Sequence, residues 1–177
     1  LGDYPTSEPQ LQLRLPTERY YEEEGRAELT PRDFGILMHR VFENAATTDE
    51  IYTAIEAMTQ DGVLDEKEAP RLRELVEKAL ADPVTAEWFG GRWQVVRNEN
   101  EIILPGSGTT RRPDRVMTDG ERAVVVDYKF GDRETARHRK QIREYLRLLR
   151  QMGYTRTEGY LWYVRLGRTE RVEEKED

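Results

Sequence analysis

The sequence contains no cysteine, only two histidines and no long apolar run. The lack of cysteine excludes disulfides, thiolate-bound zinc, cysteine-ligated iron–sulfur clusters and cysteine nucleophiles. No apolar stretch approaches the ~20 residues of a membrane-spanning helix, and the first residues lack the basic, apolar and small-residue order of a signal peptide. We therefore expect a cytoplasmic protein without membrane contact, whose chemistry depends on carboxylate, histidine, lysine or hydroxyl groups.

The 177 residues carry 28 Lys and Arg against 35 Asp and Glu, which gives a net charge of −7. This length suits a single domain whose core removes about two-thirds of the unfolded chain's surface from water. Aromatic residues occur throughout the chain, which argues against wholesale disorder. An acidic chain is a weak candidate for nucleic-acid binding unless its basic residues are clustered.

The first part of the chain changes character near residue 30. Residues 1–29 are polar and indicate an N-terminal extension, or a linker to an upstream domain outside this sequence. An alternating stretch at 11–15 could form an edge strand. Residues 30–89 have apolar residues at helical spacing. Helices are expected to begin at Thr30-Pro31, Thr48, Asp65 and Asp82-Pro83, which supply capping side chains or proline at the first turn.

Residues 90–173 change to a strand pattern. Strands are expected at 93–97, 101–104, 112–118, 123–127 and 159–164, and one helix at 135–152. The β-branched run at 123–127 is typical of a central strand covered on both faces. The predicted fold class is α/β, a sheet with helices on its faces.

Two carboxylates and a lysine are the main candidates for chemistry. Asp114 lies in one predicted strand, Asp127 ends the next, and the Asp119-Gly120 turn between them predicts an antiparallel pair. Carboxylates on neighbouring strands can share a hard cation such as Mg²⁺. Lys129 lies two residues after Asp127 and so on the same face of the strand, where an ammonium can offset charge on a phosphate. The alternative is that these residues merely flank a buried strand, as Asp and Lys often do.

A histidine on the first predicted helix could add a nitrogen ligand. His39 lies at the edge of the apolar face, one turn after Gly35, which would permit close approach to the sheet. The alternative is a boundary histidine whose hydrogen bonds are satisfied locally.

The helix at 135–152 carries polar and basic side chains in register. Gln141 and Tyr145 share one face and could bond a phosphate or position Lys129, or Tyr145 could be core and Gln141 surface. Seven basic against three acidic residues give the segment 132–150 a local charge of +4. Basic residues form a stripe along this helix and surround Asp114, and they suit a polyanion; the alternative is a solvated helix face. The candidates among them are Arg112, Arg115, Arg139 and Arg143.

Four segments follow one another along the chain: Gly35-x3-His39-x3-Glu43, Arg112-Pro113-Asp114-Arg115-Val116, Val125-Val126-Asp127-Tyr128-Lys129-Phe130-Gly131 and Gln141-x3-Tyr145. In this order they resemble a known nuclease group, the RecB-like exonuclease branch of the PD-(D/E)xK superfamily. The resemblance implies a restriction-endonuclease-like mixed central sheet flanked by helices, with an N-terminal helical subdomain. The nuclease domain would span 30–177, with a helical part at 30–89 and a catalytic sheet and helix at 90–173.

The resemblance also implies a metal site. His39, Asp114, Asp127 and the main-chain carbonyl of Tyr128 would bind Mg²⁺ or Mn²⁺, and Lys129 would be the catalytic lysine. Gln141 and Tyr145 would support the site or contact DNA. A further acidic residue is expected in the preceding strand, where Glu99 is favoured over Glu101.

The resemblance further implies DNA as substrate, cleaved by a metal-activated water. Relatives with a cysteine-bound iron–sulfur cluster are excluded. The remaining relatives resemble the C-terminal nuclease domain of UvrD/Rep-type helicase–nucleases that act in double-strand-break repair, and the resemblance favours an exonuclease over an endonuclease. No Gly-x4-Gly-Lys-Ser/Thr phosphate loop occurs in the sequence, so a helicase domain would lie elsewhere on the same chain or on another. The alternatives are an inactive DNA-binding scaffold with this fold, and an unrelated small-molecule or protein-interaction domain.

Overall fold

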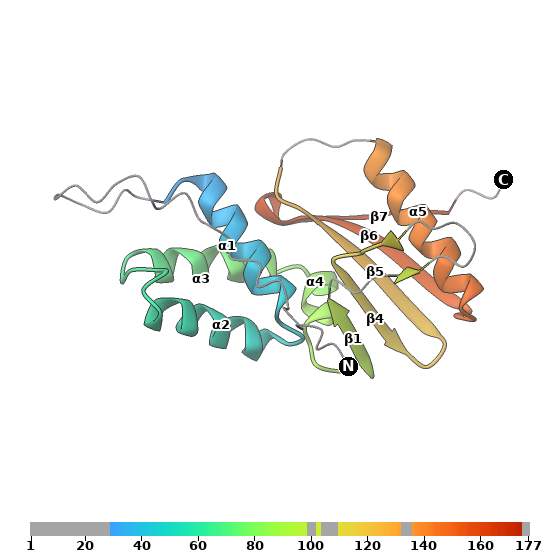
Figure 1. Ribbon diagram of the computed structural model, residues 1–177, viewed down its shortest axis with the longest axis horizontal. Helices are drawn as coiled ribbons and strands as arrows, with labels where there is room; N and C mark the ends of the chain where they lie inside the picture. The colour runs from blue at the N-terminus through green and yellow to red at the C-terminus, as the bar shows by residue number, and fades with distance from the viewer. Residues whose placement is uncertain (1–28, 99–101, 104–109, 132–135, 175–177) are drawn as a thin grey trace, which may run out of the picture.

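The computed structural model describes residues 29–98, 102–103, 110–131 and 136–174. Helices α1–α4 lie to one side of a five-stranded mixed sheet, and helix α5 covers the other side (Figure 1). This arrangement confirms the expected fold class, a restriction-endonuclease-like sheet flanked by helices. None of the helices in the described part of the chain is long and apolar enough to cross a membrane.

Three of the four N-terminal helices begin where their capping residues predict, and α3 begins later than the expected Asp65, after Lys67. The first four helices are α1 (Pro31–Glu43), α2 (Thr48–Gln60), α3 (Glu68–Ala79) and α4 (Pro83–Trp88). Thr30 and Asp33 form a reciprocal capping box at the start of α1. Helix α2 is capped by Thr47 and not by the expected Thr48, because the Thr47 hydroxyl accepts the hydrogen bond from the Glu50 N–H.

The sheet has the order β1-β4-β5-β6-β7, in which only the β5–β6 pair is parallel. A separate ribbon pairs β2 with β3. The bounds are β1 (Val95–Asn98), β2 (Ile102–Ile103), β3 (Thr110–Arg111), β4 (Arg115–Asp119), β5 (Arg122–Lys129), β6 (Arg156–Tyr163) and β7 (Arg168–Arg171). Helix α5 (Ala136–Gln151) connects β5 to β6. A short 3-10 helix, η2 (Val164–Leu166), connects β6 to β7.

Two sequence expectations about the strands are confirmed and two need correction. The Asp119-Gly120 turn joins β4 and β5 in antiparallel register, with Gly120 at φ +57°. The β-branched run of β5 is buried on both faces. Asp114 does not lie in a strand, because β4 begins only at Arg115, after Pro113, which lacks an N–H for a ladder. Strand β7 was not expected. The alternating stretch at 11–15 lies outside the described residues.

The two faces of β5 bury different cores. Val124 and Val126 pack with the apolar residues of α1–α4, whereas Ala123 and Val125 pack with α5. Gly159 on β6 lets α5 approach, because a Cβ there would collide with Ile142 and press on Leu146. This alternation places Asp127 and Lys129 on the α5 face at the end of β5.

Candidate active site at the end of the central strand

The two predicted carboxylates lie side by side where β4 begins and β5 ends. The Arg115–Val126 pair is the first of the β4–β5 ladder, so Asp114 lies one residue before it and Asp127 one residue after it on the opposite strand. Oδ2 of Asp114 accepts a hydrogen bond from the backbone N–H of Tyr128 at 2.5 Å. That bond fixes the Asp114 side chain against the end of β5.

The electrostatics of this pair favour a cation between them. Burial, together with the charge of the neighbouring Asp127, raises the pKa of Asp114 to about 7. The Asp127 side chain is only 5% exposed, and its Oδ2 forms an ion pair with the ammonium of Lys129. The cluster thus places two carboxylates and one lysine in a small, largely buried space.

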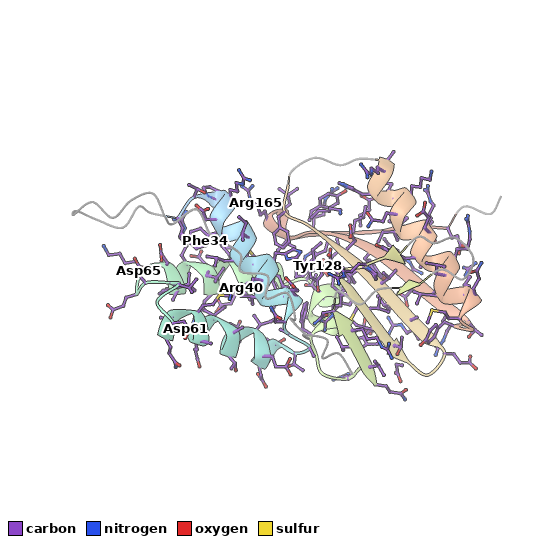
Figure 2. The ribbon with its side chains drawn as sticks, in the orientation of Figure 1. Phe34, Arg40, Asp61, Asp65, Tyr128 and Arg165 are labelled. Atoms are coloured by element: carbon purple, nitrogen blue, oxygen red, sulfur yellow. The ribbon has the colours of Figure 1, made fainter. Side chains whose placement is uncertain are left out.

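His39 reaches the carboxylates from helix α1. Its Nε2 lies 3.9 Å from Oδ1 of Asp114, and its Nδ1 lies 3.3 Å from Oε2 of Glu43 one turn later. The imidazole also makes an edge contact with the Tyr128 ring, which lies where α1 approaches the sheet (Figure 2). The contact of Nδ1 with Glu43 leaves Nε2 on the side of Asp114, where it could bind a metal ion together with that carboxylate.

A comparison with models of protein families assigns the chain to a superfamily. The model of the PD-(D/E)XK nuclease superfamily matches residues 10–177. The chain belongs to this superfamily. A search of the curated proteins finds no match. The superfamily's proteins are in general hydrolytic nucleases that use divalent metals. In this member, the carboxylate pair and the lysine lie at one end of β5, within the central sheet.

The side chains of Asp114, Asp127 and His39 have the right donor atoms for a divalent cation, but they do not surround a common point as metal ligands would. Two carboxylates and an imidazole are suitable donors for Mg²⁺ or Mn²⁺. Within the described residues, no group of three or more such side chains is close enough together to hold a metal ion. The Lys129 ammonium pairs with a carboxylate oxygen that a cation would need. Burial first, and the charge of Asp127 second, raise the pKa of Asp114, so its ionised form is disfavoured in this arrangement.

The predicted pair on α5 is in contact. Nε2 of Gln141 donates to the hydroxyl of Tyr145 at 2.9 Å. Tyr145 is fully buried in the core between α5 and the sheet, so it cannot touch DNA. Its hydroxyl accepts the hydrogen bond from the partly exposed Gln141.

The structure adds a histidine that was not among the expected site residues. His138 lies on the first turn of α5, and burial and the nearby positive charge of Lys129 lower its pKa, while Asp127 opposes this. Among the described residues, the buried Nδ1 of His138 has no hydrogen-bond partner. Its spacing of three residues before Gln141 could have indicated a common face.

The expectation that Arg115 belongs to an exposed basic group is wrong. Its side chain is fully buried, stacks 4.0 Å over the Phe89 ring and donates to three backbone carbonyls. The acceptors are the carbonyls of Ala45, Ala46 and Trp88, each at 2.7 Å. Arg115 therefore joins the sheet to the helical part and is not available to DNA. Its neighbour Arg112 is exposed.

The basic stripe of α5 is also less open than expected. Nε and Nη2 of Arg139 bond the two carboxylate oxygens of Glu170 on β7 at 2.5 and 3.2 Å. Arg143 donates to the main-chain carbonyl of Glu173, and Arg150 pairs with Glu174. The carboxylates of Glu170 and Glu174 therefore neutralise two arginines of this helix, whereas Arg143, bonded to a main-chain carbonyl, keeps its charge. Glu99 and Glu101 lie outside the described residues.

Proposed function

We propose that this domain is a metal-dependent deoxyribonuclease that hydrolyses phosphodiester bonds. The observation that carries the proposal is the contact of Asp114, Asp127 and Lys129 at the end of β5, in a chain of the nuclease superfamily. Such a cluster suits a site where a cation and a phosphate meet, because carboxylates bind the first and an ammonium binds the second.

Mg²⁺ or Mn²⁺ would be held by Asp114, Asp127, His39 and the main-chain carbonyl of Tyr128. When bound, the cation lowers the pKa of a water molecule and neutralises charge on the phosphate. The Tyr128 N–H holds Asp114 in place, and Glu43 orients the His39 ring. The Lys129 ammonium, on the same strand face as Asp127, faces the attacked phosphate and offsets its developing charge.

The supporting residues act around this centre. Gln141, held by Tyr145, lies on the helix that faces Lys129 and positions the lysine or a phosphate oxygen. Arg112, exposed beside Asp114, binds the DNA backbone, and Arg143 does so from α5. Arg139 acts only by holding Glu170. Glu99 remains our candidate for a further acidic residue.

The order of the four segments supports a RecB-like exonuclease, working with a helicase domain on the same or another chain in double-strand-break repair in the cytoplasm. Residues 30–177 would form the nuclease domain and residues 1–29 the extension or linker that precedes it.

Cleavage of end-labelled single- and double-stranded DNA tests this proposal. The wild type and Asp127→Asn are compared with Mg²⁺, Mn²⁺ or EDTA, and calorimetry measures Mn²⁺ binding. Cutting by the wild type that needs metal and is lost in the variant supports a nuclease, and the product ladder gives its polarity. DNA binding that ignores metal, without cutting by the wild type, would instead indicate an inactive scaffold.

A further inference from the structure

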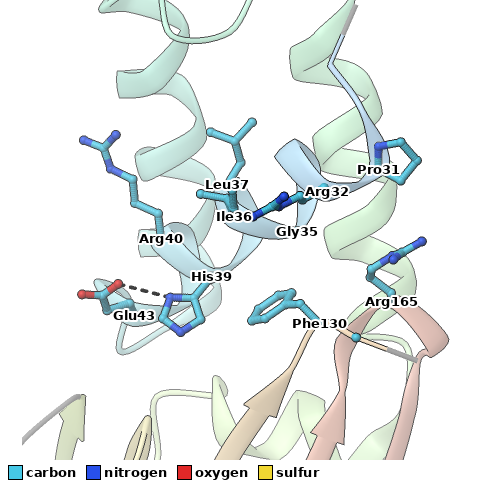
Figure 3. Close-up of a pocket in the computed structure, with 11 residues that line it drawn as sticks. Pro31, Arg32, Gly35, Ile36, Leu37, His39, Arg40, Glu43, Phe130 and Arg165 are labelled. Atoms are coloured by element: carbon cyan, nitrogen blue, oxygen red, sulfur yellow. Dashed lines mark ion pairs between the residues drawn. The ribbon is translucent and has the colours of Figure 1, made fainter. Parts of the chain in front are cut away.

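A groove opens next to the carboxylate cluster, between α1 and the end of β5 (Figure 3). Its volume is about 660 Å³. Its walls come from the exposed side of α1, from Phe130 and Gly131 directly after β5, and from Arg165 in η2. Apart from His39, none of these wall residues was expected from the sequence to bind a ligand.

The charge of the groove is mostly positive. Arg32, Arg40 and Arg165 line it, and all three are exposed. The one acidic residue among the lining side chains is Glu43, which pairs with His39. A chain of net charge −7 thus presents three guanidinium groups in one cavity, which suits a polyanion.

The groove also offers apolar surface that a phosphate alone would not need. Ile36 is 41% exposed on its wall and offers a ligand an apolar surface. The Phe130 ring lies between the His39 imidazole and the Arg165 side chain (Figure 3), with its centroid 5.3 Å from that of His39. Bases of a single strand can pack on such rings and apolar groups, whereas the bases of a duplex are stacked inside the helix.

The groove leads to the proposed catalytic centre. Phe130 follows Lys129 directly in the chain, and His39 lies both in the groove wall and 3.9 Å from Asp114. A strand in the groove would therefore place the next phosphate beside the carboxylates.

We infer that this groove binds the single-stranded DNA segment adjoining the scissile phosphate. Arg32, Arg40 and Arg165 would pair with its phosphates, and Phe130 and Ile36 would contact its bases. The inference rests on the proposed nuclease function and adds its substrate class, a single strand rather than a duplex end.

Fluorescence anisotropy of a labelled oligo-dT in EDTA tests the groove without cleavage. The test variant is the triple Arg32→Gln, Arg40→Gln, Arg165→Gln. The matched control replaces three exposed arginines elsewhere, Arg92, Arg97 and Arg156, with Gln. Both variants change the net charge equally, so a general charge effect would weaken them alike.

We expect the wild type to bind oligo-dT more tightly than a hairpin duplex of equal length. The groove variant should bind about tenfold or more weakly, and its slope of log affinity against log salt should be shallower by about 0.7 for each phosphate that is no longer neutralised. The control should change by less than about twofold. Oligo-dT carrying 5-iododeoxyuridine should cross-link to the segment containing Phe130.

Equal losses in both triple variants, preference for the duplex, or cross-links confined to other segments would overturn the groove as the binding site. Because binding is measured in EDTA, a wild type that binds in the groove but never cuts DNA would count against the nuclease and not against the groove. If the wild type cuts DNA and the groove variant binds oligo-dT normally, the result would count against the groove and not against the nuclease.

Discussion

The backbone N–H of Tyr128 donates to Oδ2 of Asp114, which ties the residue before β4 to the end of β5 beside Asp127. This bond holds a carboxylate in a position where its own charge is unfavourable, since burial and Asp127 raise its pKa to about 7. A cation bound between the two carboxylates, as we propose, would offset this unfavourable charge.

Asp114→Asn should therefore separate stability from metal binding. The amide keeps an acceptor for the Tyr128 N–H and removes the repulsion from Asp127, so in EDTA at pH 8 the free energy of unfolding should stay equal or rise. The affinity for Mn²⁺ should fall about tenfold or more. Urea unfolding and calorimetry measure the two quantities, and Asp114→Ala is the control that also loses the hydrogen bond, at about 1–3 kcal/mol. Unchanged Mn²⁺ affinity in both variants would remove Asp114 from the metal site.

Arg115→Leu should destabilise the fold by about 3 kcal/mol or more, because three backbone carbonyls, two of them buried, lose their donor at once. Arg112→Gln is the matched control, since Arg112 is exposed and its loss should cost less than about 1 kcal/mol. Urea unfolding of both variants gives the comparison. Similar small effects would mean that Arg115 does not join the sheet to the helices.

Gly159→Ala should cost about 1–3 kcal/mol, because the added methyl group collides with Ile142 under α5. Gly35→Ala is the contrasting change. A Cβ at Gly35 would meet Phe130 at an ordinary 3.6 Å, so helix propensity should raise stability by about 0.5–1 kcal/mol. The midpoint temperature of thermal unfolding should fall in Gly159→Ala and rise in Gly35→Ala. A shift in the same direction for both variants would contradict the packing described.

Arg139→Gln should leave DNA cleavage within about threefold of the wild type, because its guanidinium is already bonded to Glu170. Glu170→Gln, which removes the carboxylate paired with Arg139 and makes the surface of α5 more positive, should strengthen DNA binding at low salt and lose that gain as salt rises. Anisotropy titrations at several salt concentrations measure this. A strong loss of binding in Arg139→Gln would restore Arg139 as a DNA contact.

Much of the fold could be predicted because local signals agreed with tertiary structure. Thr30-Pro31 and Asp82-Pro83 mark helix starts, and Asp119-Gly120 marks the hairpin that brings Asp114 to Asp127. The alternation of β5 correctly predicts that Asp127 and Lys129 share a face, where they form an ion pair.

The misses have physical causes. Strand β7 reads Arg-Thr-Glu-Arg and has no apolar alternation, because it lies at the sheet edge and pairs only with β6. Because β7 is not predicted, neither is the ion pair between Glu170 on this strand and Arg139 on α5. Arg115 follows a polar, charged segment, so the sequence predicts an exposed side chain. Its backbone acceptors lie in α4 and in the turn after α1, and only the tertiary structure brings them to Arg115.

Single-turnover cleavage of a labelled single strand by the wild type and by Lys129→Met, with Mn²⁺ affinity measured on the same samples, tests the central claim most directly. The methionine keeps the length and packing of the side chain and removes the ammonium. We expect the variant to bind Mn²⁺ at least as tightly, because Asp127 loses its competing partner, and to cut about 100-fold or more slowly. Cutting at the wild-type rate, or no metal binding in either protein, would contradict the account.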